Sequence, residues 1–344
     1  MNAATFLAGI RVLDLSIWRP GPYATSLLVA LGADVLKVEP PGGDPMRHYT
    51  GLFDVINAGK RSVELDLKDD AGRERAGELA AAADVIVEGF RPGVLARFGL
   101  DYESVRTGNP GVVYCSISGY GQSDPRAPLP GHDVNYQAWA GALAPEGGAA
   151  HVSPLPIADL ASGQTGAFGI CAALLGRATT GEGTYLDVSM TDVLSTWTGP
   201  SGGSGGSGGS GASDHEVPAQ ALPGYGLFTT AEGRQIALGV VNEEHFWQRL
   251  CAALGLDELA DLTFAERSGR GDELQLAVRD AVIVHERDAL VATLTAAGVP
   301  ASPVLDRWEM LDAAPYPGFP IRLPMPVRTG AVPLLDQHRG EGFA

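Results

Sequence analysis

Two short segments contain the side chains best suited to chemistry: residues 131–136, Gly-His-Asp-Val-Asn-Tyr, and residues 156–163, which include Asp159. A histidine titrates near neutrality, and burial can raise the pKa of a carboxylate toward the same range. His132 and Asp159 therefore form a candidate pair for removing a proton from one face of a carbon acid and returning it to the other. Sequence separation alone does not show that these two side chains meet.

Each of these residues also has a purely structural interpretation. A histidine next to an aspartate is more often a hydrogen-bonded loop residue than a catalytic one. Asp159 lies just ahead of Ser162 and Gly163, where it fits the N-cap of a helix. A capping role and a chemical role for Asp159 are compatible.

Composition excludes several classes of protein. The 344 residues allow one large or two medium domains, and 45% apolar residues suffice for a sizeable core. No apolar run approaches the roughly 20 residues of a membrane span, and no signal-peptide pattern opens the chain, so we expect a cytoplasmic protein without membrane partners. A net charge of −17 argues against a nucleic-acid binder. Any anionic ligand must therefore meet locally clustered Arg or Lys.

Cofactor and metal signatures are missing from the sequence. The three cysteines, at positions 115, 171 and 251, have no metal-ligand spacing and are interpreted as reduced thiols. Residues 42–45 do not form a Walker loop, and no dinucleotide glycine fingerprint follows the first predicted strand. We expect no metal, NAD or ATP.

The first two hundred residues predict an α/β domain. A strand at 10–15, a Gly/Pro turn at 18–22, a helix at 23–31 and a strand at 34–39 make a βαβ unit, which implies a parallel sheet. The pattern recurs downstream. Further strands are predicted at 62–67, 83–88, 111–117 and 184–189, with helices at 71–82 and from Asp159 to about 175.

Residues 201–213 divide the chain. Their Gly-Gly-Ser repeat is typical of a flexible linker and is interpreted as an engineered replacement of a natural loop, with a natural low-complexity linker as the alternative. Strands at 225–228 and 234–240 and helices at 246–254 and 288–297 then predict a smaller α+β domain. We therefore expect a large domain over 1–200, a small domain over 214–310, and a segment over 311–344 that returns to the large domain.

A series of ordered motifs resembles the class III CoA-transferase superfamily (CaiB/BaiF-like), of which the α-methylacyl-CoA racemases are a branch. The resemblance covers nearly the whole chain. The matching stretches are 9–15, 31–39, 57–68, 84–94, 119–122 and 333–338, besides the two segments that hold His132 and Asp159. The resemblance implies a Rossmann-like, CoA-binding large domain, a small domain, and a homodimer of two interlocked chains.

The Gly-His-Asp-x-Asn-Tyr segment is similar to that of the racemases. This resemblance implies that His132 and Asp159 exchange the α-proton of a 2-methylacyl-CoA through an enolate, which backbone N–H groups at Asp133 or near Asp159 would stabilise. One alternative is a transferase that uses Asp159 as the acyl-accepting nucleophile. The other is a CoA-binding scaffold protein without chemistry. The acyl group is not specified by the sequence.

A glutamate of the small domain supports the histidine in racemases. The matching stretch here, residues 239–246, differs by about one residue in spacing and looks more like the transferase form. Glu243 is the best candidate, and a surface carboxylate at a helix N-terminus is the alternative.

Coenzyme A, as part of an acyl-CoA thioester substrate, brings several phosphates, so basic side chains must bind it. Arg91 and Arg97 follow a predicted strand, at the usual ligand edge of a parallel sheet, and the resemblance places both near the nucleotide. Lys60, Arg61 and Arg126 are weaker candidates. Many relatives have an arginine where this chain has Pro40 and Pro41, and Arg47 is a candidate to replace it.

Overall fold

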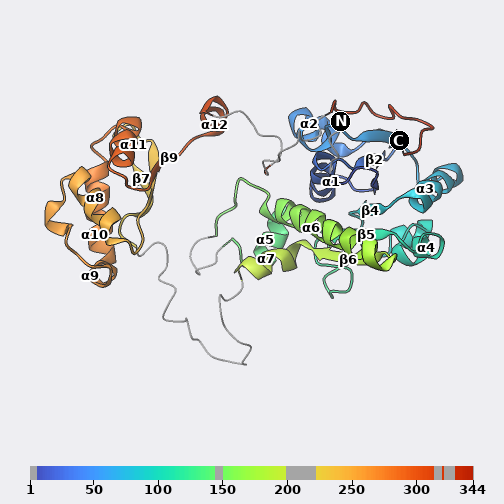
Figure 1. Cartoon of the computed structure of the whole chain (residues 1–344), viewed down its shortest axis with the longest axis horizontal. Helices are drawn as coiled ribbons and strands as arrows, with labels where there is room; N and C mark the ends of the chain where they lie inside the picture. Colours follow the sequence, from blue (N-terminus) through green and yellow to red (C-terminus); the bar gives the residue numbers. More distant parts are fainter. Residues whose placement is uncertain (1–5, 144–149, 199–221, 314–319, 321–329, 344) are drawn as a thin grey trace, which may run out of the picture. The chain divides into compact units, whose positions relative to one another are not determined.

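The computed structural model describes residues 6–143, 150–198, 222–313, 320 and 330–343. Contacts divide the chain into two compact units, which are drawn in Figure 1. Unit 1 comprises residues 1–201 and 317–344, and unit 2 comprises residues 202–316. The predicted Gly/Ser linker at 201–213 lies outside the described residues.

Unit 1 is built on a six-stranded sheet with the order β3-β2-β1-β4-β5-β6, in which every neighbouring pair is parallel. This is the strand order of a Rossmann-like fold, which confirms the predicted α/β class. The strands are β1 (Arg11–Asp14), β2 (Asp34–Glu39), β3 (Arg61–Glu64), β4 (Val85–Glu88), β5 (Val113–Ser118) and β6 (Thr184–Ser189).

Both faces of this sheet are covered, because successive side chains of a strand point to opposite faces. In β1, Val12 belongs to one apolar cluster and Leu13 to the other. Helices α1 and α6 pack on the first face, and α3 and α4 on the second. The helices of unit 1 are α1 (Pro20–Ala30), η1 (Pro45–His48), α2 (Thr50–Asn57), α3 (Asp70–Ala82), η2 (Leu95–Phe98), α4 (Tyr102–Gly108), α5 (Asp133–Trp139), α6 (Ile157–Thr180) and α7 (Met190–Thr198).

Local sequence sets the ends of these helices. Proline at the first position of α1 has the fixed φ that a helix start needs. The Asp69 carboxylate caps α3 by accepting from the N–H groups of Ala71 and Gly72. Gly181, with φ +74°, ends α6 in the left-handed conformation that glycine adopts without strain.

The segment 330–343 lies along the outer edge of β3. The Gly59 N–H donates to the Ala331 carbonyl at 2.9 Å, the His338 N–H donates to the Ser62 carbonyl at 3.0 Å, and the Glu64 N–H donates to Asp336 Oδ1 at 3.0 Å. The red chain end therefore runs beside the blue N-terminal part in Figure 1. These bonds cover the β3 side of the sheet.

Unit 2 is a three-stranded antiparallel sheet, β7-β8-β9, with helices packed around the buried Trp247. The first two strands and the helices near 246 and 288 agree with the sequence prediction, whereas β9 was not predicted. Its elements are β7 (Tyr225–Thr229), β8 (Gln235–Gly239), α8 (Glu244–Leu254), η4 (Asp257–Leu259), α9 (Phe264–Gly269), α10 (Gly271–Val282), α11 (Arg287–Ala296), β9 (Ala301–Pro303) and α12 (Arg307–Ala313).

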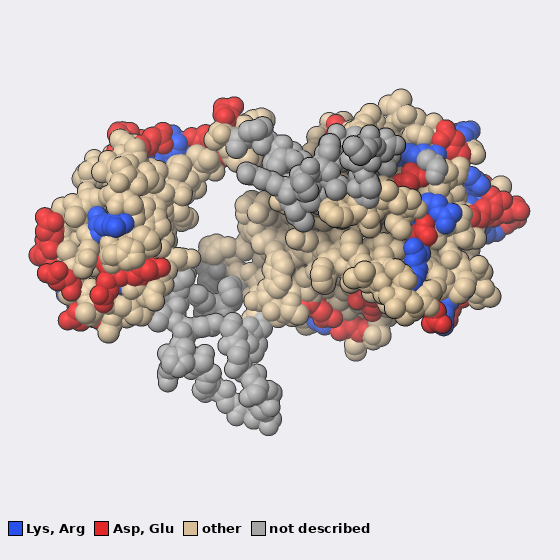
Figure 2. Space-filling model, in the orientation of Figure 1, with Lys and Arg blue, Asp and Glu red and all other residues tan. Residues whose placement is uncertain are grey.

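Charge is distributed unequally between the units. Residues 202–316 contain 7 arginines, no lysine and 17 acidic residues, a net charge of −10. On the face drawn in Figure 2, unit 2 is correspondingly red, whereas blue and red side chains are mixed on unit 1. Unit 1 is therefore the richer source of cations for a polyanionic substrate. None of the described helices combines the length and the apolar composition that a membrane span requires.

Candidate active site

A pocket of about 480 Å³ opens at the carboxyl edge of the unit 1 sheet. Its walls are loops that follow β1, β4 and β5, together with the starts of α5 and α6. This edge is where open parallel sheets bind their ligands. Its lining residues include Trp18, Arg19, Pro20, Arg91, Gly119, His132, Asp133 and Asp159.

His132 and Asp159 line this one pocket. His132 immediately precedes α5 and is exposed, and its ring lies edge-on to that of Trp18 with 6.5 Å between centroids. Asp159 is the third residue of α6, partly buried. The structural interpretation of Asp159 as a helix N-cap is wrong, because Pro156 occupies that position. The carboxylate is therefore available to the pocket.

The Asp159 carboxyl has an unusual electrostatic environment. Burial raises its pKa from an ordinary 3.8 to about 7, and the neighbouring charge of Asp133 adds to the rise. The positive charge of Arg19 opposes the rise in part. A carboxyl with a pKa near 7 can both accept and donate a proton at neutral pH.

The loop that carries His132 is fixed by Tyr136. The Tyr136 hydroxyl donates to the Gly131 carbonyl at 2.6 Å. A Cβ at Gly131 or at Gly119 would lie 2.7 Å or 2.3 Å from the Tyr136 ring, so only glycine allows the ring to fit between these two backbones. The glycine and tyrosine of the 131–136 segment thus hold the backbone on either side of His132.

The two other polar residues of this segment act on backbone groups. Asn135 Oδ1 accepts from the His132 N–H at 3.0 Å, and Asp133 Oδ1 accepts from the Asp159 N–H at 3.0 Å. Asp133 Oδ2 accepts from the Gln137 side chain. Asp133 therefore ties α5 to the first turn of α6. The Asp159 N–H was one predicted enolate donor and is taken by this bond, which leaves the Asp133 N–H as the predicted donor.

Close packing of α6 on α1 brings Asp159 to the turn after β1. Gly163 lies one helical turn after Asp159, and a Cβ there would stand 2.6 Å from the Pro20 carbonyl and 2.9 Å from the Tyr23 ring. Glycine at this position lets the two helices approach at their N-terminal ends. The positive ends of both helix dipoles consequently face the pocket.

The turn after β1 contains a site residue that the sequence reasoning missed. Residues 18–22 were predicted only as a connecting turn. Trp18 has φ +62°, a left-handed conformation that is strained for a bulky residue and that clusters at functional sites. Arg19 follows it and lines the pocket. An arginine in a Pro/Gly turn at the carboxyl end of a strand was the signal available in the sequence.

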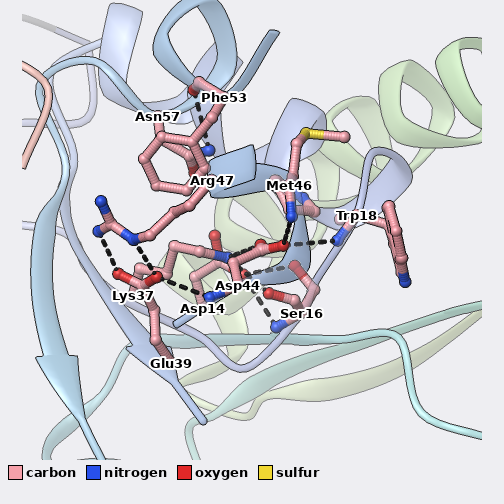
Figure 3. Close-up of polar contacts among 12 residues, drawn as sticks. Asp14, Ser16, Trp18, Lys37, Glu39, Asp44, Met46, Arg47, Phe53 and Asn57 are labelled. Carbon is pink, nitrogen blue, oxygen red and sulfur yellow. Dashed lines mark hydrogen bonds and ion pairs between the residues drawn. The ribbon is translucent and has the colours of Figure 1, made fainter. Parts of the chain in front are cut away.

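Buried charges support this turn from below, as Figure 3 shows. The Lys37 ammonium donates to the Ser16 carbonyl at 2.7 Å and pairs with Asp44 Oδ2 at 2.9 Å. Asp44 Oδ1 accepts from the N–H groups of Met46, at 2.9 Å, and Trp18, at 3.5 Å. The Arg47 guanidinium forms a two-pronged pair with Glu39 and also donates to the Pro333 carbonyl. Arg47 is thus engaged inside the protein, contrary to its candidate role as a CoA contact.

The predicted CoA-binding arginines differ in whether they line the pocket and in whether they already pair with a carboxylate. Arg91 lines the pocket and is exposed. Arg97 is exposed in η2 but is not among the residues that line this pocket. Arg61 pairs with Asp34 at 3.4 Å and with Glu341 at 2.6 Å.

The structure does not support the prediction that Lys60 and Arg126 bind CoA. The Lys60 side chain is fully buried, and its ammonium bonds to Asp14 Oδ2 at 3.0 Å and to Pro22 O and Asn57 Oδ1, each at 2.9 Å. Three internal acceptors leave it no free donor for a phosphate. The Arg126 guanidinium forms two bonds of 2.8 Å with Asp124 and is not part of the pocket lining.

Glu243 belongs to unit 2. It precedes α8, and its Oε2 accepts from the Val241 N–H at 3.2 Å. This is the position at a helix N-terminus that the alternative interpretation of Glu243 described. A supporting role toward His132 stays a prediction.

Comparison with known proteins identifies the family. A sequence model described as CoA-transferase family III matches residues 7–317. The chain belongs to this family. It is 33% identical to the acetyl-CoA:oxalate CoA-transferase of Acetobacter aceti, over 94% of this chain and 86% of that protein. It is 35% identical to the human alpha-methylacyl-CoA racemase, over 74% of this chain and 66% of that protein.

A solved structure shows the same fold in this family. The crystal structure of a CAIB/BAIF family protein from Brucella suis matches with a TM-score of 0.82 and 29% identity, covering 97% of both chains. The predicted family and fold class are therefore confirmed, and the chain is an enzyme of the class III CoA-transferase family.

Proposed function

We propose that this chain is an α-methylacyl-CoA racemase, which inverts the 2-methyl centre of an acyl-CoA thioester. The observation that carries the proposal is the shared pocket of His132 and Asp159, with the pKa of Asp159 raised to about 7. An acid–base group works best when its pKa lies near the working pH. Asp159 is such a group, and His132 in the same pocket supplies a second site that can exchange a proton with the α-carbon.

In the proposed reaction the Asp159 carboxylate takes the α-proton of one enantiomer. The electrons of the broken C–H bond move to the thioester oxygen to give an enolate, and a protonated His132 returns a proton to the other face of the α-carbon. The opposite enantiomer reacts with the two roles exchanged. The N–H of Asp133 and the positive ends of α1 and α6 would stabilise the enolate oxygen.

Binding of the CoA part is proposed for Arg91 and Arg97. Both are exposed, and neither has a carboxylate partner among the ion pairs of the described residues. They are thus available to phosphate oxygens, which guanidinium groups bind in pairs of hydrogen bonds. The homodimer that the family resemblance implies also stays a prediction, to be checked by sedimentation at micromolar concentration.

A CoA-transferase is the second candidate. It is favoured by the Acetobacter aceti relative, which is named a CoA-transferase and matches more of this chain than the racemase does, and by the transferase-like spacing around Glu243. In this reaction Asp159 would attack the thioester carbonyl and form an acyl anhydride while CoA leaves. Both reactions use the Asp159 carboxylate, but only the racemase also uses its protonated form, which a pKa near 7 keeps populated at neutral pH.

Solvent exchange separates the two reactions. A single enantiomer of a 2-methylacyl-CoA is incubated with the enzyme in deuterium oxide without any acceptor acid. The racemase proposal expects deuterium at the α-carbon and loss of optical activity, with racemisation lowered about 10²- to 10⁴-fold by His132→Gln or Asp159→Asn. His151→Gln is the matched control, because His151 is exposed and lies outside the pocket lining.

The transferase gives the opposite pattern. Turnover then requires a second carboxylic acid, hydroxylamine traps an acyl group on Asp159, and His132→Gln changes the rate only modestly. Near-normal racemisation by His132→Gln would disprove the two-base mechanism while leaving the family assignment in place.

A further inference from the structure

We infer that Arg19 binds a carboxylate on the acyl part of the substrate, so that the pocket prefers carboxyacyl-CoA thioesters to uncharged acyl-CoA thioesters of the same length. The inference rests on the proposed acyl-CoA chemistry, and it holds for a racemase or a transferase alike. It names a class of substrate that the sequence left open.

The first support is the pairing of arginines in unit 1. Among the unit 1 arginines that the structure describes, nine have a carboxylate within 4.0 Å: Arg11, Arg47, Arg61, Arg73, Arg75, Arg106, Arg126, Arg177 and Arg339. Arg19, Arg91 and Arg97 have no carboxylate of a described residue within that distance. Arg91 and Arg97 follow β4 and are proposed to bind the CoA phosphates. Arg19 is the third and follows β1.

The second support is where Arg19 lies. It lines the same pocket as His132 and Asp159 and is half-buried. Its positive charge reaches the Asp159 carboxyl, since it opposes the rise in the pKa of that group. Arg19 therefore faces the reacting end of the pocket. The group that pairs with it should belong to the acyl chain, which is the part of the substrate that reaches Asp159.

The third support is the restrained backbone on either side of Arg19. The preceding residue, Trp18, has φ +62°, and the following residue, Pro20, has its φ fixed by its ring. The Trp18 N–H donates to Asp44, and Lys37 holds the Ser16 carbonyl just upstream. A strained backbone persists only where its surroundings enforce it. Here buried charges enforce the conformation that presents Arg19 to the pocket.

Chemistry selects a carboxylate as the partner. A guanidinium offers a planar pair of N–H donors that matches the two oxygens of a carboxylate. An uncharged acyl chain would instead cover the Arg19 guanidinium with apolar groups and leave its charge uncompensated, which is costly. A substrate carboxylate paired with Arg19 would also weaken the effect of the Arg19 charge on the pKa of Asp159. Asp133 and Asp159 repel anions in their part of the pocket, and Arg91 is proposed to bind the CoA phosphates, which leaves Arg19 for the carboxylate of the acyl part.

Equilibrium binding tests the inference with two matched ligands, racemic 2-methylglutaryl-CoA and racemic 2-methylpentanoyl-CoA. They differ only in a carboxylate or a methyl group at carbon 5. Racemisation causes no net change in a racemic ligand. Because the free carboxylate of 2-methylglutaryl-CoA could accept CoA in a transferase reaction, chromatography of each ligand after titration must show it unchanged, and calorimetry then measures affinity alone. We expect the carboxylated ligand to bind at least about 10-fold more tightly to the unmodified protein, as for a charge-assisted hydrogen bond.

Three variants then define the source of that preference. Arg19→Gln should reduce the affinity ratio to about one, and Arg19→Lys, which keeps the charge but not the paired donors, should retain part of it. Arg106→Gln is the control, since Arg106 is an exposed arginine of α4 that pairs with Glu103. It should keep the full ratio. Unchanged affinity for free CoA shows that each variant is folded.

Two results would overturn the inference. One is equal affinity of the unmodified protein for the two ligands. The other is an equal loss for both ligands in Arg19→Gln, which would assign Arg19 to the CoA part. Tighter binding of the carboxylated ligand without deuterium exchange would support the inference and disprove the racemase proposal. Deuterium exchange on both ligands with equal affinity would support the racemase proposal and disprove the inference.

Discussion

The pKa values of two aspartates inside unit 1, Asp14 and Asp159, are shifted in opposite directions. Burial by itself raises the pKa of both carboxyls. At Asp14 the charges of Lys60 and Lys37 and hydrogen bonds from neighbouring hydroxyls outweigh burial and hold the pKa well below its usual range. At Asp159 the nearest carboxylate, Asp133, adds to the effect of burial, and the pKa rises to about 7.

The difference distinguishes a carboxylate that stabilises the fold from one that can exchange a proton. Asp14 lies at the end of β1 and is fully buried, so its charge is locked into the network beneath the pocket. Asp159 lies in the first turn of α6 with a carboxyl that is free to change its protonation state. Removal of charge should therefore destabilise the first region and stabilise the second.

The largest effect is expected from Lys60→Met. The substitution leaves the Asp14 carboxylate buried without its nearest cation, and breaking a buried pair in this way costs about 3–5 kcal/mol of unfolding free energy. Urea denaturation measures the loss. Lys68→Met is the control, because Lys68 is exposed and its replacement should change stability by less than about 0.5 kcal/mol. Equal stability of the two variants would show that the network contributes little.

Asp159→Asn should have the opposite sign. The pKa of Asp159 is higher in the folded protein than its ordinary 3.8, so the folded state binds this proton more tightly and loses stability as pH rises from about 4 to 7. Asparagine removes that dependence. At pH 8 the variant should be more stable by about 2–4 kcal/mol, although its racemisation rate is lowered, and near pH 4 the two proteins should differ little in stability. Unfolding curves at both pH values measure this, and a gain that does not depend on pH would contradict the assigned cause.

Gly163→Ala sharpens the comparison within α6. The added Cβ would meet the Pro20 carbonyl, so α6 must shift and overpacking should cost about 1–3 kcal/mol, with a fall in activity because Asp159 moves with the helix. In the same helix, Gly176→Ala meets nothing within 4 Å and should stabilise by about 0.5–1 kcal/mol. Thermal unfolding and an exchange assay compare the two. Similar effects of both substitutions would remove Gly163 from the positioning of Asp159.

Local sequence patterns predicted most of the fold. The strands at 34–39 and 184–189 have the predicted ends, because Gly/Pro turns and strand-forming residues mark them on both sides. The start of α6 was placed too late, since proline served as its N-cap and no side-chain cap signalled it. The strand β9 has three residues, including a proline, and is formed by pairing with β8 rather than by its own propensity.

Motif and chemistry together pointed to His132, Asp159 and Arg91, which the structure brings into one pocket, while their roles stay predictions. Lys60 was misassigned because its burial depends on Asp14, a residue that is distant in sequence and adjacent only in the folded sheet. Arg19 was missed for a similar reason. Its significance comes from the lack of an ion-pair partner among the described residues, which a sequence does not display.

The bonds that join residues 330–343 to β3 also constrain the order of folding during synthesis. The last strand of the sheet, β6, is complete by residue 189, but the segment that covers β3 is translated only after unit 2. At about 5–20 residues per second, that interval is roughly 7 to 28 s. During this time the edge strand of a nearly finished sheet offers unpaired backbone groups to any passing chain. A newly made copy is thus most prone to mispairing before residues 330–343 emerge.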